Sequence, residues 1–203
     1  MTSAHSPDLP LPARVAVDLE RDTRLDQVVD GVGRATRPLG NSPIGAVLRG
    51  DWMGHALHPT LTDLPLGMWT AASVLDVVGG VSARPAARRL LGVGLLAAGP
   101  TALTGWAEWQ RSGTSAQRVG VVHAALNITA VGLYAGSWGA RRRGRHALGV
   151  ALSLLGASAA SAGGYLGGHL AIARDVGSRA PGLQPDQPGS TTTFPVDGPT
   201  PSI

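Results

Sequence analysis

Residues 147–170 read ALGVALSLLGASAASAGGYLGGHL, a run of 24 positions without a single Asp, Glu, Lys or Arg. A helix of about twenty apolar residues is long enough to cross a hydrocarbon core ~30 Å thick. Three further apolar segments precede this run, at residues 62–81, 90–106 and 119–138. Four such helices leave too few polar faces for a soluble fold. The sequence therefore predicts an all-α fold, an integral membrane four-helix up-and-down bundle.

Small residues recur every four positions in the last of these segments and form two neighbouring stripes. The stripes consist of Gly156, Ala160, Gly164 and Gly168, and of Gly149, Ser153, Ala157 and Ser161. Helices associate in lipid by close approach at small residues. We therefore expect this helix to touch two neighbours, with Gly164 and Gly168 at a contact.

The polar flanks predict the remaining organisation of the chain. Residues 1–13 are rich in Pro and Ser and are expected to form a disordered tail. Residues 14–60 are expected to hold a short amphipathic helix, over about residues 13–35, and then a loop. That helix would lie on the membrane surface or fold back on the bundle. The four-helix transmembrane domain takes 61–173, and the Pro/Gly/Ser/Thr-rich residues 174–203 are expected to be a disordered tail.

Composition excludes several classes of function. The chain has no cysteine, so disulfides, iron–sulfur clusters and thiolate zinc sites are excluded. The 17 basic residues are all arginine, and they do not form a basic run with interleaved aromatics, so we expect no nucleic-acid partner. No glycine-flanked serine elbow or phosphate-binding glycine loop is present. The sequence therefore predicts no catalytic residue.

The arginines predict the orientation of the bundle. Both chain ends and the connection at 107–118 lie on one side of an up-and-down bundle, here called the terminal face. Seven arginines occupy the connections on the other side, at residues 82–89 and 140–146. The positive-inside rule places those connections in the cytoplasm. Asp76 lies near them and is expected to form an ion pair with one of their arginines.

Polar side chains from all four predicted helices converge at the terminal face. The candidate site residues are His58, Asp63, Glu108, His123, Asn127 and His169, with His55 just before the first helix. His123 and Asn127 are four residues apart and share a helix face. Ionisable groups inside a membrane are costly and usually face the bundle interior.

Four interpretations of this convergence are open. In the first, the polar groups cap helix ends and hydrogen-bond one another. In the second, two of the histidines are the axial ligands of a b-type haem, with Arg49 or Arg118 for its propionates. In the third, the three histidines and a carboxylate hold a divalent metal. The fourth is a quinone site beside the tryptophans of that face.

Several motifs in the chain resemble a known family. They are GHALHPTLTDLPLG at residues 54–67, LTGW at 103–106, VH at 122–123 followed by Asn127, and GGYLGGHL at 163–170. The chain resembles the bacterial membrane proteins known as domain of unknown function 2231. The resemblance implies a small helical bundle in the bacterial inner membrane and singles out His58, His123 and His169, but the family has no established activity. Similar proteins often continue into a Rieske iron–sulfur domain, for which this chain has no cysteine.

These observations favour a multi-pass membrane protein that is a non-catalytic anchor or accessory module in a redox context. Its expected partners are the lipid bilayer and a separate redox protein, with a homo-oligomer left open. The alternative is a haem-b electron carrier that uses His123 with His169 or His58. A metal or proton transporter is the second alternative, disfavoured because the middle of the bundle has no line of polar residues.

Overall fold

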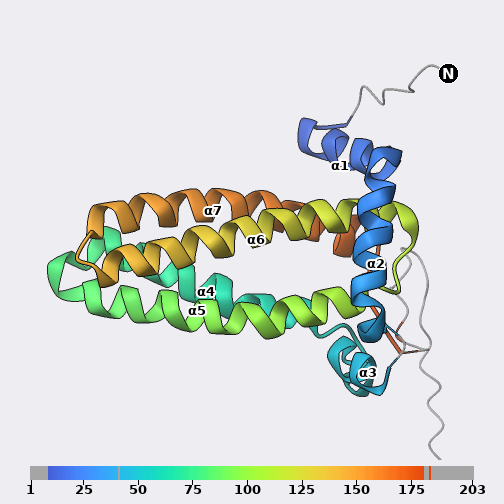
Figure 1. Cartoon of the computed structure of the whole chain (residues 1–203), viewed down its shortest axis with the longest axis horizontal. Coiled ribbons are helices and arrows are strands. Elements are labelled where there is room, and N and C mark those ends of the chain that lie inside the picture. The colour runs from blue at the N-terminus through green and yellow to red at the C-terminus, as the bar shows by residue number, and fades with distance from the viewer. Residues whose placement is uncertain (1–8, 41, 181–182, 184–203) are drawn as a thin grey trace, which may run out of the picture.

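The computed structural model describes residues 9–40, 42–180 and 183, and within them its regular structure is helical. Four long helices form a bundle in which consecutive helices run in opposite directions (Figure 1). They are α4 (His58–Val78), α5 (Gly80–Trp109), α6 (Thr114–Arg142) and α7 (His146–Gly168). The predicted all-α class is confirmed.

Three of the helices have the length and apolar composition of membrane spans. These spans are Gly80–Trp109, Thr114–Arg142 and His146–Ala173, the last of which joins α7 to a π-helical turn at His169–Ala173. Within the described residues α4 is not among them. It carries the carboxylates of Asp63 and Asp76, which lower the mean hydropathy by which a membrane span is recognised.

The bundle consists of two helical hairpins, since α4 packs mainly on α5, and α6 mainly on α7. Trp69 of α4 stacks on Tyr134 of α6, with ring centroids 4.1 Å apart and planes inclined by 19°. Both rings are buried, together with Leu91 of α5. Small residues beside the rings let the helices approach, and a Cβ added to Gly94 would lie 2.4 Å from Trp69 Nε1.

The arginine-rich connections are shorter than the sequence predicted. The α4–α5 hairpin turns over at Gly79 and Gly80, where Gly80 has a φ of 60°. Residues 82–89, expected to form a loop, are the first turns of α5, and α6 extends through Arg142. Alanine and arginine are good helix formers. A hydropathy profile therefore marks where the apolar run ends, and the helix continues beyond it.

The expected stripes of α7 are buried at Gly149, Ser153, Gly156 and Ala160, but near its C-terminal end the contact face lies one position earlier than expected. A Cβ added to Gly163 would lie 3.1 Å from the Asn127 side chain, and one added to Gly167 would lie 2.9 Å from the His123 ring. At Gly164 and Gly168 an added Cβ would meet nothing within 4 Å. The expectation that Gly164 and Gly168 lie at a contact is wrong. The spacing of small residues does not show which side of a helix meets its neighbour. Here that side is the one that faces Asn127 and His123 of α6.

The N-terminal segment forms three short helices instead of one helix and a loop. They are α1 (Leu11–Arg21), α2 (Asp26–Gly40) and α3 (Pro43–Arg49). Asp22 separates α1 from α2 because its carboxylate accepts a hydrogen bond from the Arg24 backbone N–H. Ser42 caps α3 by accepting from the Gly45 N–H.

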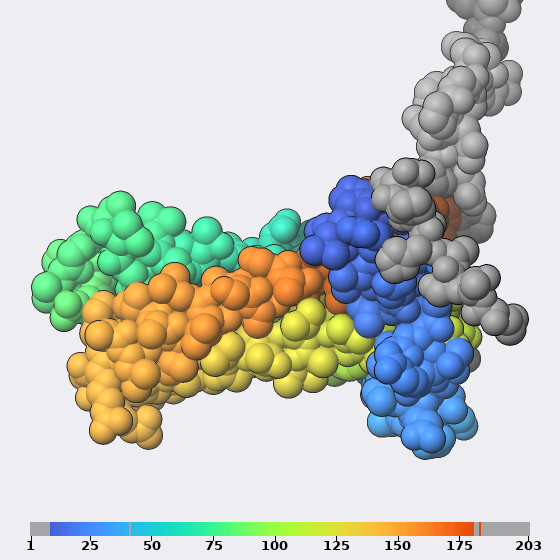
Figure 2. Space-filling model, turned by 90° about the horizontal axis from the view of Figure 1, so that it is seen from above, coloured from blue at the N-terminus to red at the C-terminus, as the bar shows by residue number. Residues whose placement is uncertain are grey.

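These helices gather at one end of the bundle, and α2 lies across it (Figures 1 and 2). That end is the terminal face, where α5 ends and α6 begins. Of the predicted tails at 1–13 and 174–203, residues 1–8, 181–182 and 184–203 fall outside the described residues. The described parts are ordered, since α1 begins at Leu11 and Ser178 and Ala180 bond to Glu108 and Gly54.

Candidate functional site

His58 and His123 each bond to the backbone of the next helix. His58 Nδ1 donates to the Thr101 carbonyl of α5 over 2.9 Å, and His123 Nδ1 donates to the Gly163 carbonyl of α7 over 2.7 Å. A carbonyl only accepts, so we assign the proton of each neutral ring to Nδ1. The two ring centroids are 6.3 Å apart, with planes at 84°. The structure thus brings these two predicted site residues together.

Glycines make room for both imidazoles. A Cβ added to Gly105 would lie 2.8 Å from His58 Cε1, and one added to Gly167 would lie 2.9 Å from His123 Cε1. These distances are shorter than real Cβ contacts, so a side chain at either position would displace the ring. The rings therefore fill recesses in the helices that receive their hydrogen bonds.

Asn127 supports His123 and no other residue of the predicted site. Its amide nitrogen lies 2.9 Å from the His123 carbonyl and 3.1 Å from His123 Nε2. With Nδ1 as the donor, Nε2 accepts from this amide. His58 Nε2, by contrast, has no hydrogen-bond partner among the residues that the structure describes. The unprotonated nitrogens of the two rings are thus in different environments.

His169 is engaged by the N-terminal helices. Its Nε2 lies 2.7 Å from Glu20 Oε1, and Arg174 bonds both oxygens of the same carboxylate at 2.5 and 2.8 Å. Burial alone would raise the pKa of Glu20, but the hydrogen bonds and charges of Arg174 and His169 lower that pKa below its ordinary value. The carboxylate is therefore ionised at neutral pH and ties α1 to the end of α7. Ligation by His169 stays a prediction.

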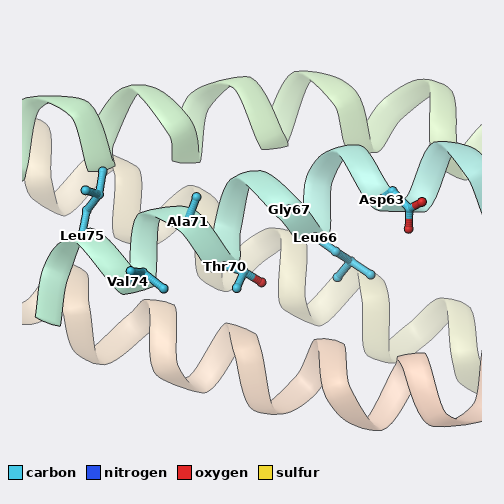
Figure 3. A pocket seen from close by; sticks show the side chains of 7 residues that line it. All are labelled: Asp63, Leu66, Gly67, Thr70, Ala71, Val74 and Leu75. Atoms are coloured by element: carbon cyan, nitrogen blue, oxygen red, sulfur yellow. The ribbon is translucent and has the colours of Figure 1, made fainter. Parts of the chain in front are cut away.

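Asp63 and Glu108 lie apart from the histidine pair. Asp63 is exposed on the outer side of α4, at one end of a groove of about 690 Å³ that runs past Leu66, Thr70 and Val74 (Figure 3). Glu108 is buried and accepts two hydrogen bonds from Ser178. Within the described part of the chain, no three His, Asp or Glu side chains are close enough together to hold a metal ion.

The arginines expected to bind haem propionates have other partners. Arg118 pairs with Asp26 at 2.7 and 3.0 Å, and its hydrogen bonds are the main cause that lowers the pKa of Asp26. Arg49 is buried and pairs with Asp51 at 2.8 Å. The Arg118 contact fastens α2 to α6, whereas the Arg49–Asp51 pair lies within the N-terminal segment. The Arg118–Asp26 pair could not be predicted from the sequence, because charge alone does not reveal which residue 92 positions away becomes the partner.

The ion pair predicted for Asp76 is present at the end of the bundle opposite the terminal face. Arg141 Nη1 and Nη2 each donate to a carboxylate oxygen of Asp76 over 2.6 Å. The two side chains are 2% and 5% exposed, so they are fully desolvated. Ser137 and Ser153 add hydrogen bonds to the guanidinium. The expectation that Asp76 joins two helices through an arginine is confirmed.

Comparison with known proteins gives one match. A family described as "Predicted membrane protein (DUF2231)" matches residues 54–180, which is more than half of the chain. The matched region contains α4–α7 and the histidine pair. No curated protein and no solved structure matches the chain.

Proposed function

The chain belongs to the DUF2231 family of predicted membrane proteins, and we propose that its bundle is a four-crossing, non-catalytic anchor or accessory module of the bacterial inner membrane. The observation that carries this proposal is that the candidate histidines form hydrogen bonds that hold neighbouring helices together. His58 joins α4 to α5 and His123 joins α6 to α7 through backbone carbonyls. His169 joins the end of α7 to α1 through the side-chain carboxylate of Glu20. The redox context rests on the resemblance to Rieske-linked proteins.

The crossing by α4 is supported by its packing and by its charge balance. It packs along α5, and the carboxylate near its C-terminal end is neutralised by Arg141. A paired charge at a helix end is far cheaper in lipid than an isolated one at the centre. Asp63, the other carboxylate, lies in the second turn of α4, close to the terminal face. The 21 residues of α4 are enough for one crossing.

Single cysteines test the crossing, because the natural chain has none. Thr60→Cys lies in the first turn of α4 and Ser82→Cys lies just beyond its C-terminal end, and both positions are exposed. A membrane-impermeant maleimide added to spheroplasts is expected to label position 60 only, and to reach position 82 after lysis. Ser115→Cys, before the bulk of α6, should behave like position 60. Labelling of 60 and 82 from the same side would contradict a crossing by α4.

The N-terminal helices are proposed to rest at the bilayer surface. They lie across the bundle end, and Ile44, Val47 and Trp52 are more than half exposed there. Apolar side chains and an indole at that level suit the headgroup region of a bilayer. The cysteine labelling above extends to this segment, since Val47→Cys should be shielded in membranes and reactive in detergent.

A second candidate function is a haem-b electron carrier. The specific observation that favours it is the Nδ1–carbonyl bond of each paired histidine, the arrangement that orients imidazoles toward a metal in many proteins. The surroundings fit less well, because Asn127 donates to His123 Nε2 and the nearby arginines are paired. Bound haem would supply one-electron transfer, with His58 and His123 as its ligands.

An absorption spectrum of detergent-purified protein separates the two functions. The anchor proposal expects no Soret band, with or without dithionite. A band that shifts on reduction and is lost in His123→Ala would establish the haem carrier instead. His169→Ala is the matched control, since Glu20 holds that ring away from the pair.

A further inference from the structure

A polar cavity of about 580 Å³ lies at the terminal face, away from the histidine pair. Its walls come from the turn at Gly54–His55, from the end of α5 with the turn that follows, and from residues 175–180. The volume is in the range of cavities that take small molecules. Of the candidate site residues, Glu108 and His55 border it.

The wall formed by residues 175–180 is fastened by specific bonds. The Ala180 N–H donates to the Gly54 carbonyl over 2.8 Å, and Arg179 pairs with His55 as an isolated β-bridge. Ser178 donates both its N–H and its hydroxyl to Glu108 Oε2, each over 2.9 Å. These bonds join three distant parts of the chain around one space.

Glu108 lines this cavity and carries a buried, unsatisfied oxygen. The residue is 8% exposed, and its Oε1 is buried without a hydrogen-bond partner among the described residues. A buried polar oxygen without a partner is costly. Oε2 is already occupied by Ser178, so the missing partner is a hydrogen-bond donor directed at Oε1.

The charges around the cavity indicate the chemistry of the ligand that carries this donor. Asp51 pairs with Arg49 at 2.8 Å, and Asp175 pairs with Arg179 at 2.5 Å. Among the described lining residues this leaves one anion and one cation without an ion pair, Glu108 and Arg111. Arg111 is exposed at the rim. A ligand that balances them carries one positive and one negative group.

We propose that this cavity binds a primary ammonium linked to a phosphate, the chemistry of phosphoethanolamine. The ammonium donates to Glu108 Oε1, and the phosphate lies against Arg111, whose guanidinium suits phosphate oxygens. The cavity lies at the end of α5 on the terminal face, which meets the lipid headgroups in the proposed four-crossing arrangement, so the inference rests on that proposal. The group comes from a phosphatidylethanolamine headgroup or from the free molecule. The histidine pair has no part in this inference.

Isothermal titration calorimetry of the full chain in detergent tests the proposal. Phosphoethanolamine and dihexanoyl phosphatidylethanolamine are titrated separately, each beside its choline counterpart. A quaternary choline nitrogen cannot donate a hydrogen bond, so its binding is expected to be at least about tenfold weaker. Binding of both ethanolamine compounds identifies headgroup chemistry, binding of the lipid alone identifies a lipid site, and binding of the free compound alone identifies a soluble ligand.

Substitutions test the two charged groups. Glu108→Gln keeps an acceptor for Ser178 but removes the charge, and we expect affinity to fall at least about tenfold. Arg111→Gln, at an exposed position where folding is not at risk, should also weaken binding. Arg89→Gln at the opposite end of α5 is the matched control and should bind as the natural chain does. Lack of binding by both ethanolamine compounds, equal binding of choline, or unchanged affinity in Arg111→Gln would overturn the proposal.

Discussion

Replacement of Asp76 by alanine is expected to lower the free energy of unfolding by about 3–5 kcal/mol. The change leaves the Arg141 guanidinium buried at 2% exposure without its counter-charge. The serine hydroxyls that remain around it are neutral and compensate only in part. Helix content followed by circular dichroism during an SDS titration in detergent measures the loss.

Two further variants separate charge burial from simple truncation. Asp63→Ala changes the same residue type on the same helix at an exposed position, and it should alter stability by less than about 0.5 kcal/mol. Asp76→Leu combined with Arg141→Met removes both charges and should recover most of the lost stability, because apolar pairs often replace buried ion pairs without loss. Ser137 and Ser153 still bond each other in that variant. A double variant as unstable as Asp76→Ala would show that the pair is itself stabilising.

Replacement of Gly94 by leucine is the second change with a large expected effect, a loss of about 3 kcal/mol. A Cβ at this position would lie 2.4 Å from Trp69 Nε1 and 2.7 Å from its Cδ1. The indole cannot retreat, because Tyr134 is stacked on it at 4.1 Å. The contact between α4 and α5 must therefore open. Thermal unfolding in detergent, followed by tryptophan fluorescence, reports both the stability and the displaced ring.

Gly99→Leu is the control for this substitution. It lies on the same helix, and an added Cβ there would meet nothing within 4 Å. Leucine also forms helix better than glycine by ~0.8 kcal/mol, so the control should be neutral or slightly more stable. Equal losses at positions 94 and 99 would mean that the recess for Trp69 is not what matters.

The sequence located the long helices well and their ends poorly. The segments 90–106 and 119–138 each fall within one long helix, since an apolar run of this length has few alternatives to a helix in lipid. The segment 62–81 runs past the end of α4 into the first turn of α5, and 147–170 passes from α7 into the π-helical turn. The starts and ends lie in polar sequence, where Arg84, Arg88 and Arg89 extend α5 and where Pro43 begins α3. Local propensity and capping decide these boundaries, and hydropathy carries no information about them.

The site was predicted in part for a similar reason. Up-and-down threading brings His58 and His123 to one level, and the structure places them 6.3 Å apart. Threading does not give the direction of a side chain around its helix. The prediction therefore missed that Asp63 lies on the outside of the bundle. Nor does it show that Glu20, 149 positions away, takes His169 as its partner. Contacts with the N-terminal segment depend on tertiary packing that no local pattern encodes.

The short α4–α5 hairpin has a consequence for how the protein meets bilayers of different thickness. α5 carries Arg84, Arg88 and Arg89 in its first turns and Glu108 in its last turn, and it follows α4 directly after Gly79. Sliding α5 along its axis would draw one set of charges toward hydrocarbon, at up to ~2.5–3.5 kcal/mol for each at the centre. The charged residues at both ends of α5 therefore fix the depth of this helix in the bilayer. In the proposed four-crossing arrangement, a thinner or thicker bilayer is accommodated by tilt of the two helices together.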